Sequence, residues 1–239
     1  MKCTTILTFA ILVFCCLPAT RLWAQPSSRN YRQPVILLET TAGGTTYKGE
    51  LHPQFSRWGA VASIGIRFNF KKRLNGALRA SYGKISGQSL EPLQLAESTT
   101  PAPYFATSFL SAQYHLHLNL LKTRKFQVFV AQGAGFMRFD PRDEQQQSLS
   151  SQATTRPPGQ EYATTTAVLP TSLGAIALLP NGYGAGIRTE LLNPLSDYLD
   201  NLSLPAGSGN IDQVFSIQAT VLVPLSFYQE YSRKNRKKR

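Results

Sequence analysis

The clearest pattern along the chain is a strict alternation of apolar and polar residues. In residues 58–70 every second residue, beginning with Trp58, is apolar, and the residues between them are mostly small or polar. The same alternation runs through residues 104–121 and 212–228. Because successive side chains of a β-strand point to opposite faces, each stretch is predicted to be a strand with two unlike faces.

Weaker runs of the same kind fill the gaps and bring the number of predicted strands to eight. They cover residues 35–47, 76–86, 126–140, 165–179 and 183–193. The run 126–140 is apolar on both faces, so its pattern does not predict which face is which. Pro170 lacks an N–H for the strand ladder and is predicted to mark a bulge or a strand end.

The connections between these strands alternate in length. Short turns start at Lys71 ("KKRLNG"), Leu121 ("LKTRK") and Leu179 ("LPNGYG"), and two of them contain Asn-Gly, a favoured hairpin pair. Long polar segments cover residues 88–103, 141–163 and 194–211. An even number of strands with short turns at one end and long loops at the other predicts an all-β, eight-stranded antiparallel transmembrane β-barrel of outer-membrane type, over residues 34–228.

The composition of the polar faces decides between a soluble barrel and a membrane barrel. A soluble lipocalin-like barrel would expose a face rich in Lys and Glu, whereas these faces carry Gly, Ser, Thr, Asn and Gln, which suit a narrow lumen. Gly43 and Gly44 are assigned to that lumen. Aromatic residues gather at the strand ends, as two membrane interfaces require. One group comprises Tyr47, Trp58, Tyr82 and Tyr104, and the other comprises Phe68, Phe70, Phe126, Tyr183, Phe227 and Tyr228.

The N-terminal residues have the layout of a secretory signal peptide. Lys2 precedes the apolar stretch 5–17, and a small-residue cleavage site ends at Ala24. The stretch is shorter than the roughly 20 residues of a spanning helix. A lipoprotein signal at Cys15 or Cys16 is the other alternative.

These boundaries predict four parts of the chain: a signal peptide at 1–24, a periplasmic leader at 25–33, the barrel, and a basic tail at 229–239. Both termini then lie in the periplasm, and the protein is integral to the bacterial outer membrane. All three cysteines fall in the signal peptide, so no disulfide is expected in the mature chain.

The net charge of +12 is distributed unevenly along the predicted barrel. Export argues against nucleic acid as the partner. The short turns and the tail are basic, and ten of the 13 acidic residues fall near the long loops. The basic residues are Lys71, Lys72, Arg73, Lys122, Arg124, Lys125, Arg233, Lys234, Arg236, Lys237, Lys238 and Arg239. We expect this end to contact either an acidic periplasmic partner or anionic lipid head groups.

Five further charged residues fall on lumen-facing positions: Glu39, Arg67, Arg79, Arg188 and Glu190. An isolated charge in a narrow interior is costly, so these residues are predicted to pair with one another and to leave no open pore.

Other chemistry has weaker support in the sequence. His115 and His117 share a strand face, but His52 lies in a loop and a closed metal site needs three or four ligands, so neither a metal nor a cofactor is expected. Two roles remain open for Asp197, Asp200 and Asn201: they bind calcium, or they cap turns through hydrogen bonds to their own backbone. Lipid-modifying barrels need a nucleophile, a base and an acid near the rim, and no Ser–His pair is so placed; we predict that the chain is not an enzyme.

Three segments resemble the DUF6089 family of small outer-membrane barrels. They are "GGTTYKGEL" at Gly43, "IGIRFNFKKRLNGALRASYGKISG" from Ile64, and "SDYLDNLS" at Ser196, within a resemblance that covers residues 34–228. Glu50 and Asn201 each stand where the family usually has Asp. The residues that match the family motifs are Gly43, Gly44, Tyr47, Gly49, Glu50, Asp197, Tyr198 and Asp200.

This family occurs in bacteria with type IX (Por) secretion and gliding machinery, and one branch is implicated as an outer-membrane partner of the periplasmic ring. The resemblance implies a structural anchor linked to protein secretion, with secretion-ring or lipoprotein components as partners. The alternative is a surface barrel that acts through its extracellular loops in adhesion or membrane integrity.

Overall fold

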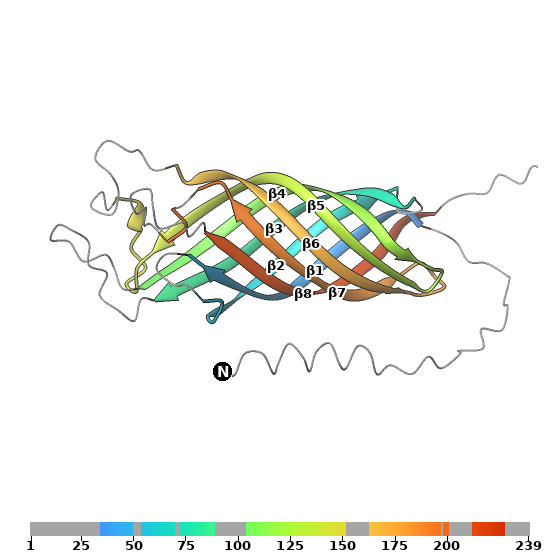
Figure 1. Ribbon diagram of the computed structural model, residues 1–239, viewed down its shortest axis with the longest axis horizontal. Helices are drawn as coiled ribbons and strands as arrows, with labels where there is room; N and C mark the ends of the chain where they lie inside the picture. Colours follow the sequence, from blue (N-terminus) through green and yellow to red (C-terminus); the bar gives the residue numbers. More distant parts are fainter. Residues whose placement is uncertain are drawn as a thin grey trace, which may run out of the picture. The chain divides into compact units, whose positions relative to one another are not determined.

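The computed structural model describes residues 34–49, 54–69, 72–88, 104–151, 163–196, 198–200 and 212–227. They form a closed antiparallel barrel of eight strands, in which each strand pairs with the next and β8 pairs with β1 (Figure 1). The strands are β1 (Pro34–Lys48), β2 (Trp58–Phe68), β3 (Leu74–Gln88), β4 (Tyr104–Lys122), β5 (Phe126–Arg142), β6 (Thr165–Leu178), β7 (Gly184–Pro194) and β8 (Gln213–Phe227). The predicted fold class is confirmed, and each strand end lies within about two residues of its predicted position. The predicted signal peptide, leader and tail lie outside the described residues.

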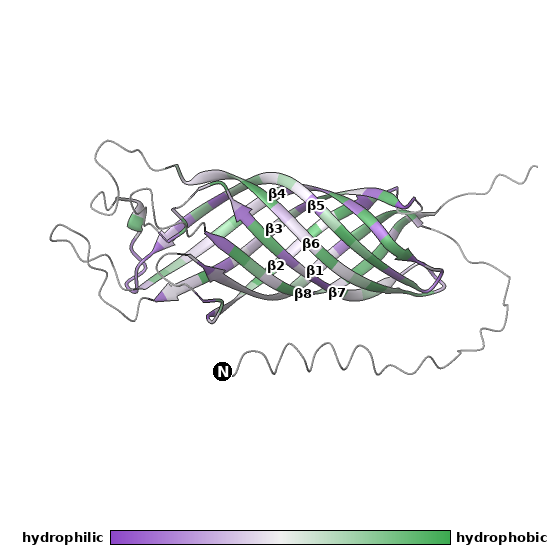
Figure 2. Cartoon of the chain, in the orientation of Figure 1, coloured by the Kyte–Doolittle hydropathy of each residue, from purple (hydrophilic) through white to green (hydrophobic). Residues whose placement is uncertain are grey.

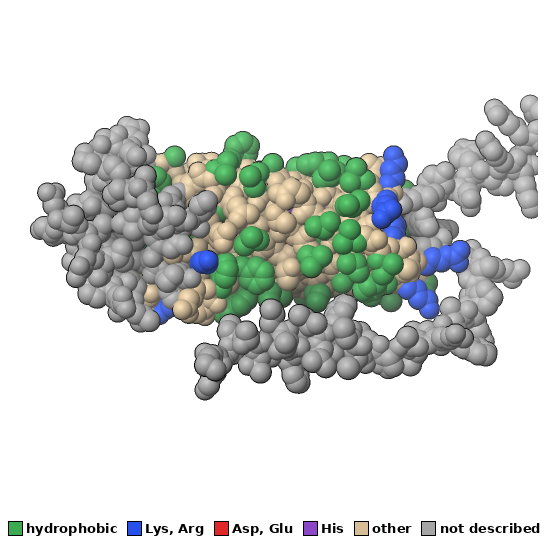
Figure 3. Space-filling view, viewed as in Figure 1, with side chains coloured by type: hydrophobic (Ala, Val, Ile, Leu, Met, Phe, Trp, Pro, Cys, Tyr) green, Lys and Arg blue, Asp and Glu red, His purple; other side chains and the backbone are tan. Residues whose placement is uncertain are grey.

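The alternation of the sequence becomes an apolar outside and a polar inside. On β4, Leu110 is 56% exposed, whereas the adjacent Ser111 is 1% exposed. Figure 2 shows the hydrophobic residues alternating along each strand, and Figure 3 shows them gathered around the middle of the barrel. Exposed apolar surface of this extent is unfavourable in water and favourable against lipid. The fold is therefore a transmembrane barrel of outer-membrane type.

The orientation of β5, which the sequence pattern left open, is settled by the burial of its side chains. Phe129, Met137 and Phe139 are buried at 0–1% exposure, whereas Phe136 is 68% exposed. The inside of β5 thus carries large apolar side chains, as does the inside of β4 at Phe105 and Phe109.

Among the described residues there is no helix long and apolar enough to cross a membrane.

The two adjacent glycines of β1 face opposite sides of the barrel. Gly43 lies on the inward side with Thr41 and Thr45, and a Cβ atom there would collide with the β8 backbone. A Cβ atom at Gly44 would lie 2.8 Å from Cε3 of the exposed Trp58. The prediction that both glycines line the lumen is wrong for Gly44, because neighbouring strand residues must alternate.

The turn between β2 and β3 closes earlier than the Asn-Gly pair predicts. Asn69 takes a positive φ of 57°, and its carbonyl accepts a hydrogen bond of 2.8 Å from the Lys72 N–H. Asn tolerates this left-handed conformation. Asn75 and Gly76 instead belong to β3, and Asn75 is buried in the lumen. In the β6–β7 turn the Asn-Gly pair lies in the turn as predicted, and Gly182 takes a positive φ of 88°.

Pro170 neither ends β6 nor shifts its register, contrary to prediction. The pairing with β5 keeps the same register on both sides, from Gln132↔Thr171 to Gly135↔Val168. The proline ring fits above Gly133, where a Cβ atom would lie 2.8 Å from its Cγ. The Gln132 side chain donates a hydrogen bond of 3.1 Å to the Pro170 carbonyl. A glycine on the neighbouring strand thus accommodates the ring.

Most of the described aromatic residues at the strand ends are at least partly exposed. Trp58 and Tyr82 are about half exposed at the loop end, and Tyr183 is exposed at the turn end. Tyr47 is an exception that corrects the prediction: it is fully buried inside the barrel. Phe70, Tyr228 and the Phe227 side chain lie outside what the structure describes.

We expect Leu116→Arg to lower the free energy of unfolding in lipid vesicles by about 2–4 kcal/mol, because it places a charge on the lipid-facing side of β4. The control is Leu179→Arg, at an exposed position in the β6–β7 turn, where the cost should be about 0–1 kcal/mol. Urea titration followed by tryptophan fluorescence measures both. Equal costs at the two positions would contradict the assignment of the lipid-facing band.

Candidate functional site

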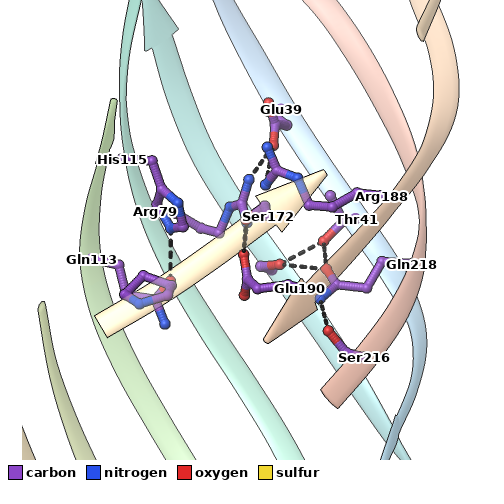
Figure 4. Close-up of polar contacts among 12 residues, drawn as sticks. Glu39, Thr41, Arg79, Gln113, His115, Ser172, Arg188, Glu190, Ser216 and Gln218 are labelled. Carbon is purple, nitrogen blue, oxygen red and sulfur yellow. Dashed lines mark hydrogen bonds and ion pairs between the residues drawn. The ribbon is translucent and has the colours of Figure 1, made fainter. Parts of the chain in front are cut away.

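Glu39 is the centre of an ion-pair network inside the barrel. Its Oε2 lies 2.6 Å from Nη2 of Arg67 on β2, and its Oε1 lies 2.9 Å from Nη1 of Arg188 on β7. Arg79 on β3 donates a hydrogen bond to the same Oε1 (Figure 4). All four side chains are at most 2% exposed. One carboxylate therefore links β1 to its neighbour β2 and to β3 and β7, which do not pair with β1.

A second carboxylate extends the network. Arg79 uses its other nitrogen, Nη1, to donate a hydrogen bond of 2.8 Å to Glu190 Oε2 on β7. Ser172 on β6 donates a 2.9 Å hydrogen bond to the same oxygen. The structure thus places all five charged residues predicted for the lumen in one buried cluster, which we call the ion layer: Glu39, Arg67, Arg79, Arg188 and Glu190. Ser172 was not identified from the sequence, since serine is common on every inward face.

Neutral polar side chains pack beside the ion layer. Thr41 donates a 2.5 Å hydrogen bond to Gln218 Oε1, and Gln218 Nε2 donates one of 2.8 Å to Ser216 (Figure 4). On β4, Gln113 donates a 2.9 Å hydrogen bond to Ser111, and its Oε1 lies 2.8 Å from Nε2 of His115. These contacts fill the lumen with hydrogen-bonded side chains that leave little freedom to move.

Apolar clusters also fill the interior on either side of these polar layers. The cluster at the loop end, called the upper cluster, comprises Tyr47, Val61, Ile85, Phe105, Phe109, Met137, Phe139, Leu149, Val168, Leu192, Leu199 and Val214. The lower cluster, toward the turn end, comprises Leu37, Phe129, Ala131, Ile176, Leu178 and Leu222. Two leucines of the upper cluster come from connections, one of them in the helical turn η1 (Leu149–Ser151). The lumen is therefore closed above and below the ion layer.

The buried Tyr47 fixes one loop segment in the mouth of the barrel. Its hydroxyl donates to Asp212 or, at 3.0 Å, to Asp200 Oδ2. The Leu199 N–H donates a 2.9 Å hydrogen bond to Asp212 Oδ2, and Thr107 donates one of 2.6 Å to the Leu199 carbonyl. Asp200 and Asp212 lie near the rim as predicted, but they are buried. The family-motif residues Tyr47, Tyr198 and Asp200 thus share one region, whereas Glu50 and Asp197 lie outside the described residues.

The two histidines of β4 have structural partners. His115 contacts Gln113, and His117 packs against the Phe129 ring with centroids 4.9 Å apart. In the part of the chain that the structure describes, no group of three His, Cys, Asp or Glu side chains is arranged to hold a metal ion.

Among the described residues, two of the three turns at the turn end of the barrel carry an exposed basic patch. Its described members are Lys72, Arg73, Lys122, Arg124 and Lys125, and Figure 3 shows Lys and Arg side chains at this end. The two turns lie together, because Arg73 donates a 3.3 Å hydrogen bond to the Asn119 carbonyl and Lys122 donates one of 3.2 Å to the Lys72 carbonyl. The β6–β7 turn, with the sequence Leu-Pro-Asn-Gly-Tyr, carries no charge. Lys71 and the tail lie outside the described residues.

No protein-family model matches the chain, and no curated protein sequence matches it. The resemblance to DUF6089 therefore stays a prediction. Among solved structures, the Neisserial surface protein NspA is 11% identical over 79% of this chain and 96% of that one, with a TM-score of 0.47. Ail of Yersinia pestis is 9% identical over 80% and 99%, with a TM-score of 0.44. The outer membrane enzyme PagL is 13% identical over 79% and 99%, with a TM-score of 0.37. Because these similarities are low, the function has to be argued from the residues of this chain.

We expect Glu39→Gln to lower the free energy of unfolding by about 3–5 kcal/mol, because it leaves the arginines around Glu39 with less negative charge in a buried site. The control is Asp140→Asn, which breaks the exposed pair with Arg142 and should cost about 0–1 kcal/mol. Equilibrium unfolding in urea measures both. A loss at Glu39 no larger than at Asp140 would show that the network does not stabilise the barrel.

The packed lumen predicts that the purified barrel does not conduct ions in large, steady steps. The ion layer and the two apolar clusters occupy the path along the barrel axis. Planar-bilayer recordings at neutral pH test this expectation, with a known porin as the positive control. Reproducible steps of constant size from the wild-type barrel would contradict it.

Proposed function

We propose that this barrel is a non-enzymatic anchor or scaffold of an envelope assembly in the bacterial outer membrane. A filled lumen leaves the two ends of the barrel as the surfaces for interaction. The only described Ser and His side chains linked by hydrogen bonds are Ser111 and His115, which both contact Gln113. They are buried inside the barrel, where a substrate has no access, and this supports the non-enzymatic role. The anchored assembly belongs to the machinery of type IX (Por) protein secretion. This assignment rests on the DUF6089 resemblance alone.

The basic patch is the observation that carries this proposal. Lys72, Arg73, Lys122, Arg124 and Lys125 are exposed on the β2–β3 and β4–β5 turns. Lipid surrounds a barrel on all sides, so attraction to anionic head groups gives no reason for the described β6–β7 turn to lack the charge that the other two turns carry. An acidic protein that docks below one side of the barrel gives such a reason, since complementary charge steers and orients a partner.

The second candidate is a surface barrel that acts through its extracellular loops, in adhesion or membrane integrity. The observation in its favour is that the mouth is ordered by loop residues. Leu149 and Leu199 are buried in the upper cluster, so their segments are held in place at the loop end. Segments fixed in this way present a constant surface to the exterior.

Affinity purification of the tagged barrel from cross-linked outer membranes tests the anchor role, with partners identified by mass spectrometry. We expect wild type to recover periplasmic secretion-ring or lipoprotein components. A variant with Lys72, Arg73, Arg124 and Lys125 changed to Glu should lose most of them, because an acidic partner is then repelled. A chain lacking residues 232–239 tests the contribution of the tail.

The matched control is the pair Lys84→Glu and Arg138→Glu, which reverses charge at exposed positions on the loop-end halves of β3 and β5. This control should retain the partners. Recovery of the barrel alone from wild-type membranes would contradict the anchor role and favour the loops. Equal recovery from wild type and the turn variant would show that the basic patch is not the docking surface.

A further inference from the structure

The ion layer contains one more positive charge than negative charge. Its arginines are Arg67, Arg79 and Arg188, and its carboxylates are Glu39 and Glu190. Arginine keeps its charge in proteins, so the excess cannot be removed by loss of a proton. An uncompensated charge in a buried site costs several kcal/mol. The layer therefore needs one further negative charge close by.

The described carboxylates outside the layer are poorly placed to supply it. Asp200 and Asp212, the other buried acids in the part of the chain described, contact Tyr47 at the mouth. Tyr47 follows Glu39 by eight residues of β1, which corresponds to roughly 26 Å at about 3.3 Å per residue. The upper cluster lies around Tyr47 and separates these acids from the ion layer.

Two unused donors of Arg188 lie near Phe129. Arg188 pairs with Glu39 through Nη1, while its Nε and Nη2 have no hydrogen-bond partner among the described residues. Its guanidinium carbon lies 5.2 Å from the Phe129 centroid, and that of Arg67 lies 4.8 Å from it. Two guanidinium groups from different strands therefore meet at one ring.

His117 and Asn75 add polar atoms on the same side of the barrel. His117 packs on Phe129, and it pairs in register with Asn75 on β3. Both ring nitrogens of His117 and both side-chain polar atoms of Asn75 are buried and lack hydrogen-bond partners among the described residues. The edge of an aromatic ring is electropositive, so the rim of Phe129 also favours negative charge.

We propose that the barrel binds one small monovalent anion of the halide class beside Phe129, between Arg188 and His117. The anion balances the third arginine and accepts hydrogen bonds from Arg188 and Asn75. Since the apolar clusters close the lumen, the anion enters as the barrel folds and does not exchange readily afterwards. The site is independent of the proposed anchoring role and acts on the stability of the barrel.

The test is to refold the full mature barrel from urea into detergent micelles at fixed pH and ionic strength, with bromide or the bulky anion gluconate as the salt. Because the anion binds only the folded state, the folding equilibrium constant should rise up to about tenfold for each tenfold rise in bromide above its dissociation constant. Arg188→Gln removes the excess charge and should abolish this dependence. Arg73→Gln, which removes one arginine from the exposed patch, should retain it.

Crystals of wild-type barrel that has been refolded and crystallised in bromide give a second readout that does not depend on any variant folding. An anomalous peak within contact distance of Arg188 is the expected result. The proposal is overturned if no such peak is present, whatever the salt does to stability, because water then occupies the site. Equal folding constants in bromide and gluconate would overturn it as well.

Discussion

The ion pairs of Glu39 with arginines on three other strands are the interaction on which the rest of the barrel depends. An eight-stranded barrel has an interior only wide enough for side chains, so whatever lies inside must fill it completely. Glu39 forms ion pairs with Arg67 of β2, Arg79 of β3 and Arg188 of β7. Arg79 also pairs with Glu190 and so extends the network. The Arg67 pair joins neighbouring strands, but the other pairs join β1 to β3, β1 to β7 and β3 to β7, which the backbone ladder does not connect. They therefore specify how opposite walls of the barrel lie relative to one another.

Such a network is stable only if water is kept from competing with it, and the apolar clusters provide that condition. The lower cluster is built around Phe129, whose ring covers Gly174 and contacts Arg67 and Arg188. The upper cluster includes Leu149 and Leu199, which come from connections and not from strands. The residues that order the mouth thus also help to keep water away from the ion layer. A barrel filled in this way presents only its lipid-facing side and its two ends to other molecules.

Much of the fold follows from the sequence because a membrane barrel imposes a strict rule on every strand. Residues that face lipid must be apolar, whereas most residues that face the lumen are small or polar, so period-two alternation predicted the bounds of all eight strands closely. The same rule placed Glu39, Arg67, Arg79, Arg188 and Glu190 inside, since a charge has no place on the lipid side. What it did not predict was which arginine meets which carboxylate, because that depends on the lengths and directions of the side chains across the lumen.

Two of the predictions that failed, those for Tyr47 and Pro170, depended on a residue far away in the sequence. Tyr47 has an apolar ring and a polar hydroxyl, so its type suits a membrane interface and a polar interior equally well; its contact with Asp212, 165 residues later, decides between them. Pro170 is accommodated in mid-strand because Gly133 on the neighbouring strand leaves room for its ring. Local pattern thus determines the face and extent of each strand, whereas side chains that meet across the barrel determine how the interior is closed.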